Sequence, residues 1–244
     1  MTQQDDVRGS SVPTQRPDLH QAVAELQQAV GELQHAAHAP GTLGPAPTGV
    51  LVGAGSDPLM LGLPAFVAGW TTVGLALVGV VPPAAVAGVV PILLLGTALF
   101  QLIAAVWAFM LGQSLVAAIF GLFSGAAASL SILLLGLSHN WFAVPVADVP
   151  HVQALFTITW GIVFVFLTWI MFTLPAVYGV IMVLVLTALG LLSGGFWTGN
   201  TNLITGGGAA VLAFAALGAW AWLNVASEAD RRPAWPPLGP PLRK

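Results

Sequence analysis

The chain has 244 residues and a formal net charge of −3, with 57% hydrophobic residues, 6% charged residues and no cysteine. From Pro58 to Ser227 its single formal charge is Asp148, whereas a water-soluble domain carries charge at about a quarter of its positions. The composition indicates an integral membrane protein and excludes disulfides and thiolate metal sites, and the lack of a basic cluster before residue 231 argues against a nucleic-acid partner.

The polar part of the chain precedes the apolar part. Residues 1–17 are predicted to be disordered, and residues 40–56, rich in Pro, Gly, Thr and Ala, to be a linker. Residues 18–39 are predicted to form an amphipathic helix with Asp18 as its N-cap. Its apolar side chains follow a heptad spacing: Leu19, Val23, Leu26, Val30, Leu33 and Ala37. This spacing leaves open whether the helices pair between copies or lie singly on the membrane or the protein.

The apolar part, residues 57–227, divides into segments of about 20 residues, the length that crosses a bilayer. The predicted spans are 58–80, 84–108, 115–137, 153–174, 176–195 and 203–224. Clusters of Pro, Gly and polar residues separate them, and the longest break runs from Ser138 to His151. The predicted fold class is therefore an all-α integral membrane protein with six transmembrane helices.

The basic residues indicate the topology of these spans. All of them lie near the two ends of the chain: Arg8, Arg16, Arg231, Arg232, Arg243 and Lys244. Cytoplasmic segments next to spans collect Lys and Arg, and an even number of spans puts both ends on one side. We therefore expect both termini in the cytoplasm and a multi-pass protein of the cell (inner or plasma) membrane. The proline-rich residues 228–244 are predicted to be a disordered cytoplasmic tail.

The spans offer little for catalysis. The two histidines and the carboxylate of this region, His139, His151 and Asp148, lie in the break at 138–151 and not inside a span. We interpret them as solvated loop residues rather than a metal or proton site. No glycine-rich phosphate loop with its lysine is present. We therefore predict no enzyme activity, no cofactor and no metal. The spans do contain neutral polar side chains: Gln101 lies within a span, and Asn200 and Asn202 lie at a span edge. They can form hydrogen bonds with a small solute or with a neighbouring helix.

Several short motifs recur in a known order between about residues 55 and 227. The first span opens with Asp57-Pro58-Leu59-Met60-Leu61-Gly62-Leu63, followed by Phe66. The second contains Phe100-Gln101-Leu102-Ile103-Ala104-Ala105. Trp160-Gly161 lies in the fourth, and Gly199-Asn200 leads into the sixth. In this order and spacing the chain resembles the acetate uptake transporter (AceTr) family, which contains the bacterial succinate–acetate permeases.

The resemblance implies a six-span protomer in a homo-hexameric ring, with a path through each protomer for a small monocarboxylate such as acetate. Family members act as proton-coupled symporters or as anion channels. The resemblance also implies a hydrophobic constriction, which falls on Phe66, on Phe123 and on either Val185 or Leu186. The motif residues Asp57, Pro58, Leu61, Gly62 and Leu63 are implied to contribute to the substrate path. With them we expect Gln101, Asn200 and Asn202 to hold the substrate through neutral hydrogen bonds.

The chain also departs from the family pattern. The opening Asn is Asp57, a Glu of the second span is Ala108, and a Tyr of the third is Phe123. An ionised Asp57 would repel an anion, so either its carboxyl is protonated during transport or the substrate is not an anion, and the other changes remove polarity. We therefore expect a permease or channel for small monocarboxylates, passive or proton-coupled, in which the proton travels with the undissociated acid or binds at Asp57. Two alternatives remain: a channel for a small neutral solute or gas, and a non-transporting membrane scaffold or accessory subunit that assembles through the N-terminal helix.

Overall fold

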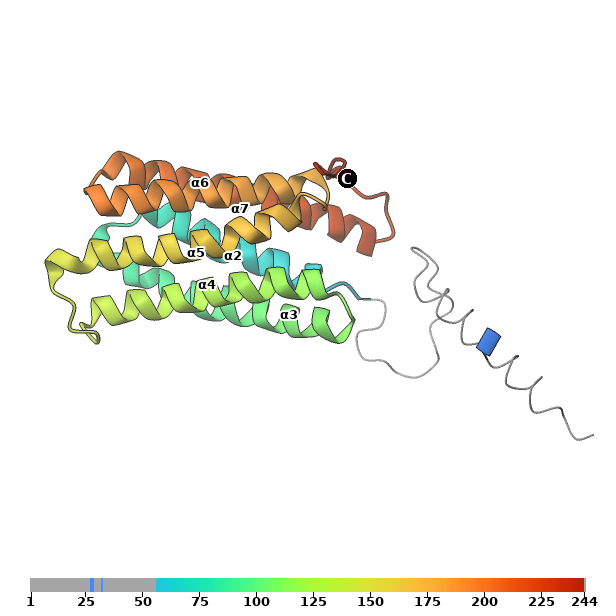
Figure 1. Ribbon diagram of the computed structural model, residues 1–244, viewed down its shortest axis with the longest axis horizontal. Coiled ribbons are helices and arrows are strands. Elements are labelled where there is room, and N and C mark those ends of the chain that lie inside the picture. Colours follow the sequence, from blue (N-terminus) through green and yellow to red (C-terminus); the bar gives the residue numbers. More distant parts are fainter. Residues whose placement is uncertain (1–26, 29–31, 33–55, 244) are drawn as a thin grey trace, which may run out of the picture. The chain divides into compact units, whose positions relative to one another are not determined.

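A computed structural model of the chain describes Gln27, Gln28, Glu32 and residues 56–243 (Figure 1). The three N-terminal residues are helical and exposed, and Gln28 Nε2 donates a hydrogen bond to Glu32 Oε1 at 3.2 Å. The predicted disorder of residues 1–17, the heptad side chains of 18–39 and nearly all of the linker lie outside the described residues.

Six segments of the described chain are long and apolar enough to span a membrane. They are Leu59–Leu77, Ala85–Met110, Ser114–Ser138, Val146–Met171, Ala176–Thr198 and Thr201–Ala229. Residues 56–243 form no strand, so the predicted all-α protein with six spans is confirmed. Each predicted span overlaps its observed segment, because Pro, Gly or polar residues interrupt the apolar runs near the helix ends.

Five of the spans are built on single α-helices. These are α2 (Leu59–Leu77), α4 (Ser114–Ser138), α5 (Val149–Met171, after the short 3₁₀ helix η3, Val146–Asp148), α6 (Ala176–Thr198) and α7 (Thr201–Ala229). Breaks at left-handed glycines separate α3 from α4 at Gly112 (φ 74°) and α6 from α7 at Gly199 (φ 69°). Asn200 then caps α7, because its side chain accepts hydrogen bonds from the amides of Asn202 and Leu203.

The second span changes its helical winding along its length. It starts as the 3₁₀ helix η1 (Pro83–Val89), continues as the π-helix η2 (Ile92–Leu99) and ends as α3 (Phe100–Met110). Hydroxyl bonds tie the π-helical part to its neighbours: Thr97 Oγ1 donates to the Ala65 carbonyl at 2.9 Å, and Ser124 Oγ donates to the Ala98 carbonyl at 2.8 Å. π-Helical turns occur frequently at functional sites.

The helices pack as an antiparallel bundle (Figure 1). α2 packs against α7, α7 against α6, and α6 against α5, while η2 and α3 lie against both α2 and α4. α4 and α5 touch only sparsely, so the ring of helices is loosest there. One end of the bundle holds the starts of α2, α4 and α6; we call this the motif end, since Asp57 lies there. The other holds the starts of α5 and α7 and is called the loop end.

The segment after α7 folds back onto the motif end, which differs from the disordered tail that its proline content led us to expect. Asn224 Nδ2 donates to the Pro236 carbonyl at 2.8 Å, and the Val177 amide donates to the Leu238 carbonyl at 3.1 Å. The Arg243 guanidinium lies 4.6 Å from the centroid of the Trp169 ring. Composition did not reveal this order because it comes from tertiary contacts with α5, α6 and α7.

Candidate substrate path

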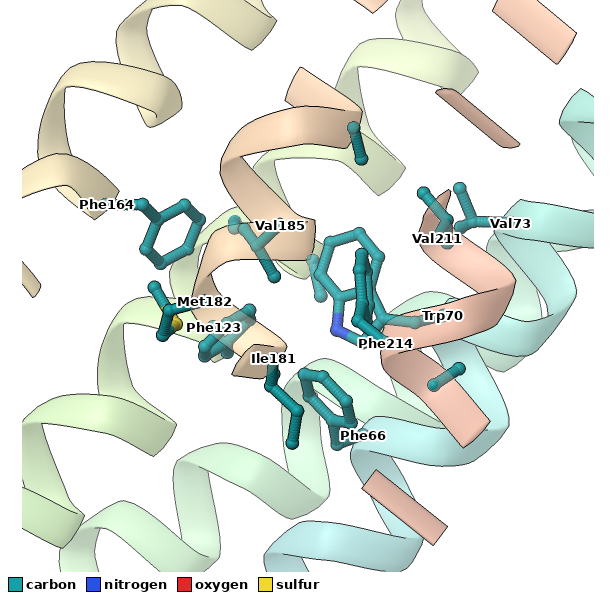
Figure 2. Packing of buried hydrophobic residues seen from close by; sticks show 14 of the residues in the cluster. Phe66, Trp70, Val73, Phe123, Phe164, Ile181, Met182, Val185, Val211 and Phe214 are labelled. Carbon is teal, nitrogen blue, oxygen red and sulfur yellow. The ribbon is translucent and has the colours of Figure 1, made fainter. Parts of the chain in front are cut away.

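Five aromatic side chains meet in the middle of the bundle: Phe66, Trp70, Phe123, Phe164 and Phe214 (Figure 2). They come from α2, α4, α5 and α7 and are all nearly buried. The ring centroids of Phe66 and Phe123 are 5.1 Å apart, those of Phe66 and Phe214 are 5.5 Å apart, and those of Phe123 and Phe164 are 4.7 Å apart. We call this group the aromatic cluster. Its rings fill the space that a path along the bundle axis would need.

Small residues make room for the phenyl rings. A Cβ at Gly218 of α7 would stand 2.8 Å from Phe66 Cδ1, and a Cβ at Gly62 would overlap the ring of Phe120. Both distances are shorter than real side chains allow, so only glycine lets α7 and α4 come this close to α2. Gly218 on the neighbouring helix α7 therefore helps to set the position of the Phe66 ring on α2.

A cavity of about 480 Å³ lies on the loop-end side of the aromatic cluster. Its wall at the cluster is formed by Trp70, Phe123, Phe164, Val185 and Phe214. It reaches toward the loop end, where Gly79, Pro82, Gln153, Phe196 and Thr201 line it. No acidic or basic side chain of the described part of the chain lines this cavity.

A smaller cavity of about 140 Å³ lies on the motif-end side. Leu59, Leu63, Phe66, Phe123 and Tyr178 are among its lining residues. Phe123 lines both cavities, so one phenyl ring stands between them. The bundle therefore contains a chamber on each side of a closed aromatic barrier.

The predicted constriction residues fall at this barrier. Phe66 and Phe123 are 5% and 3% exposed and touch edge to face. Val185 of α6 is buried and lines the larger cavity, whereas Leu186 is half-buried at the edge of the hydrophobic core and lines neither cavity. Of the two alternatives on α6, Val185 is the one that lies beside the barrier (Figure 2).

The predicted polar residues are not brought together. Asp57 lies at the motif end, where its Oδ1 accepts the amide of Leu59 at 2.8 Å and caps α2. Asn200 and Asn202 are exposed at the loop end, and the Asn200 side chain is used in capping α7. None of the three lines either cavity. Of the motif residues, Pro58, Gly62 and Leu63 are buried, Leu61 is half-buried, and Leu63 lines the smaller cavity.

Gln101 occupies an unusual position. It is completely buried, and neither its Nε2 nor its Oε1 has a hydrogen-bond partner among the described residues. It follows Thr97 by one helical turn on the side of the second span that faces the interior. It lines neither cavity, so substrate binding by this amide stays a prediction.

Two polar groups that line the larger cavity, the Thr157 hydroxyl and the Trp160 indole N–H, are already hydrogen-bonded. Thr157 Oγ1 donates to the Ala154 carbonyl at 2.9 Å and lies 2.8 Å from Ser193 Oγ. Trp160 Nε1 donates to Ser129 Oγ at 3.2 Å. These groups join helices to one another. At the loop end, His139, Asp148 and His151 form no group of metal-binding geometry with other described residues.

Trp70 and Phe214 of the aromatic cluster belong to none of the motifs found in the sequence. Trp70 follows Phe66 by four residues, so it shares the inward face of α2, and this spacing was a usable signal. Phe214 had no such signal, because α7 is apolar all round and gives no periodic contrast between its inward and outward faces.

Three comparisons place these features among known proteins. The model of the GPR1/FUN34/yaaH family matches residues 40–235, which is more than half of the chain. No curated protein matches the sequence. Two chains of solved structures match, among them the structure of the bacterial acetate channel SatP. That match has 18% identity and a TM-score of 0.66, and it covers 75% of this chain and 98% of the channel chain. The fold is therefore similar to that of the channel.

Proposed function

Since the chain belongs to the GPR1/FUN34/yaaH family of multi-pass membrane proteins, the acetate transporter family, we propose that it is a permease for small monocarboxylic acids such as acetate. The observation that carries the proposal is the pair of cavities that end on opposite faces of the aromatic cluster and share Phe123. Such a barrier between two chambers is the arrangement of a gated path. The solved structure of the bacterial acetate channel SatP has a fold similar to that of this chain.

The cargo crosses the barrier as the undissociated acid. An ionised carboxylate in an apolar constriction loses its hydration, and no acidic or basic side chain among the described residues lines either cavity to replace it. A protonated carboxyl group is neutral and small enough to pass between phenyl rings. Transport of the acid carries one proton with each molecule, so uptake is coupled to the pH gradient without any titrating residue in the path.

The proposed gate consists of Phe66, Phe123 and Val185. Its support is the edge-to-face pair of Phe66 and Phe123, which both line the smaller cavity, and the place of Val185 in the wall of the larger one. With both termini in the cytoplasm, the larger cavity opens outward and the smaller one inward. Each protomer has its own path, and the protomers assemble as a homo-hexamer. The protein performs no covalent chemistry and uses no cofactor.

The proposal is tested by uptake of labelled acetate into proteoliposomes across an imposed pH step. We expect uptake that rises with the pH gradient and is strongly reduced in Phe66→Trp, because the larger ring fills the barrier. The matched control is Phe109→Trp, since Phe109 is 73% exposed on the outer surface of the second span.

The remaining outcomes discriminate between the alternatives. Fast permeation of a neutral solute such as glycerol without acetate uptake would favour a neutral-solute channel. No flux of any solute from a well-folded preparation would favour a scaffold. The mass of the detergent-solubilised particle checks the hexamer, and a monomer contradicts it.

A further inference from the structure

One polar atom lies within the aromatic barrier itself: the indole N–H of Trp70. The side chain is 9% exposed, and its Nε1 is buried with no hydrogen-bond partner among the described residues. An indole nitrogen is a donor and cannot accept, so it can be satisfied only by an acceptor atom. A buried donor without a partner is rare in native proteins, because the group loses its hydrogen bonds to water and gains none in exchange.

Packing prevents this ring from turning away to find a partner. Its centroid lies 5.8 Å from that of Phe214, 6.1 Å from that of Phe123 and 6.4 Å from that of Phe66. The neighbouring Gly69 lies against the side chain of Thr97, which holds this turn of α2 close to the second span. Three phenyl rings therefore fix the indole, and none offers a strong acceptor.

Comparison with the other tryptophans of the bundle shows what is particular to Trp70. Trp160 also lines the larger cavity, and its N–H donates to Ser129. Trp220 donates to the Pro237 carbonyl at 3.2 Å. Trp222, like Trp70, has a buried N–H with no partner in the part of the chain that the structure describes, but it lines neither cavity. Trp70 alone among these four combines an unpaired N–H with a position at the wall of a cavity.

We propose that Trp70 Nε1 is the donor that holds an oxygen of a small carboxylic acid as it enters the barrier between Phe66 and Phe123. The inference rests on the proposed function and names a binding residue that motif comparison did not provide. A carboxyl group brings an acceptor oxygen to the N–H and a methyl group to the surrounding rings. Trp70 thereby gives the barrier a preference for solutes with an accessible oxygen over purely apolar ones.

The experiment measures the concentration dependence of acetate uptake in proteoliposomes at a fixed pH step. In Trp70→Phe we expect the half-saturating acetate concentration to rise about three- to tenfold, which is the change in affinity that corresponds to the loss of one net hydrogen bond. The matched control is Trp222→Phe, which makes the same substitution at a buried, unpaired indole outside the cavities and should leave that concentration within about twofold of the wild type.

A second variant separates the hydrogen bond from the shape of the ring. Benzothienylalanine at position 70 keeps the size of the indole and replaces its N–H by sulfur, so it should reproduce the effect of Trp70→Phe. Size-exclusion profiles check that each variant folds.

The results have distinct meanings. If wild-type uptake saturates and the benzothienyl variant has the same half-saturating concentration, Trp70 does not donate to the substrate. The proposed function is not affected by that result. The same holds if wild-type uptake never saturates. No acetate uptake by the wild type removes the proposed function and this role with it.

Discussion

The phenyl ring of Phe66 meets that of Phe123 edge to face, with their centroids 5.1 Å apart and their planes at 85°. This is a favoured geometry for an aromatic pair, since the positive edge of one ring contacts the negative face of the other. The pair joins α2 to α4 at the level where the two cavities approach each other. The proposed barrier is thus also a well-packed part of the core.

Replacing Phe123 by Ala is expected to connect the cavities, because this ring lines both of them. The flux of a longer acid such as butyrate should rise relative to that of acetate, which paired uptake assays measure. The free energy of unfolding should fall by about 3–5 kcal/mol through loss of core packing. Phe109→Ala, on the outer surface, serves as the control. An unchanged butyrate-to-acetate ratio in Phe123→Ala contradicts a gate at this residue.

Gly218→Ala tests the space behind Phe66. The added Cβ would stand 2.8 Å from the ring, so Phe66 must shift toward Phe123. We expect a loss of stability of about 1–3 kcal/mol by overpacking and slower acetate uptake. Gly190→Ala is the control, because nothing lies within 4 Å of its Cβ position and helix propensity alone favours alanine there. Equal thermal stability of the two variants would refute the argument.

Asp57→Asn tests whether the carboxylate at the head of α2 takes part in transport. Asn keeps an oxygen for the Leu59 amide, and Asp57 lines neither cavity. We therefore expect unchanged uptake and an unchanged pH profile, whereas Asp57→Ala should lose about 1 kcal/mol of stability with its cap. A pH profile that shifts in Asp57→Asn would show that the carboxyl group binds the transported proton.

Gln101→Leu should not destabilise the protein, because it removes two buried polar atoms that have no partner and keeps a similar volume. Thr97→Val is the matched comparison: Thr97 is equally buried one turn away, but its hydroxyl donates to Ala65, so its loss should cost about 1 kcal/mol. Thermal unfolding in detergent ranks the two variants. Substrate binding by Gln101 predicts, in addition, slower uptake by the stable Gln101→Leu protein.

Asn224→Ala is expected to release the C-terminal segment, since the Asn224 amide donates to the Pro236 carbonyl in a buried site. The unpaired carbonyl should cost about 1–3 kcal/mol. Faster tryptic cleavage after Arg231 is the readout, since Pro233 protects the bond after Arg232 from trypsin. Asn202→Ala, at an exposed position of the opposite end, provides the comparison, and cleavage at the same rate in both proteins would argue against an anchored segment.

The spans could be predicted from the sequence because lipid imposes a length and excludes charge, and Pro and Gly mark each break. Which side chains face inward could not be derived in the same way. α6 and α7 are apolar on all sides, so Val185 and Leu186 are equivalent by composition, and only packing distinguishes the buried residue from its half-buried neighbour.

The family resemblance indicated the aromatic residues of the proposed path, but the polar residues that accompany them could not be derived from the sequence. Asp57 and Asn200 each belong to a short motif of the family pattern, yet they cap helices at opposite ends of the bundle. Trp70 belongs to none of the motifs, and only the structure shows that its N–H has no partner among the described residues. Polar residues at helix ends are therefore weak indicators of a transport site.

The aromatic cluster has a consequence for the energy balance of the membrane. An ion that reached the rings from either chamber would lose its hydration shell and find no counter-charge among the side chains described there. Water likewise finds few partners between the rings and cannot form a continuous wire for protons. In the proposed path, such a barrier would pass the neutral acid without also becoming a leak for ions.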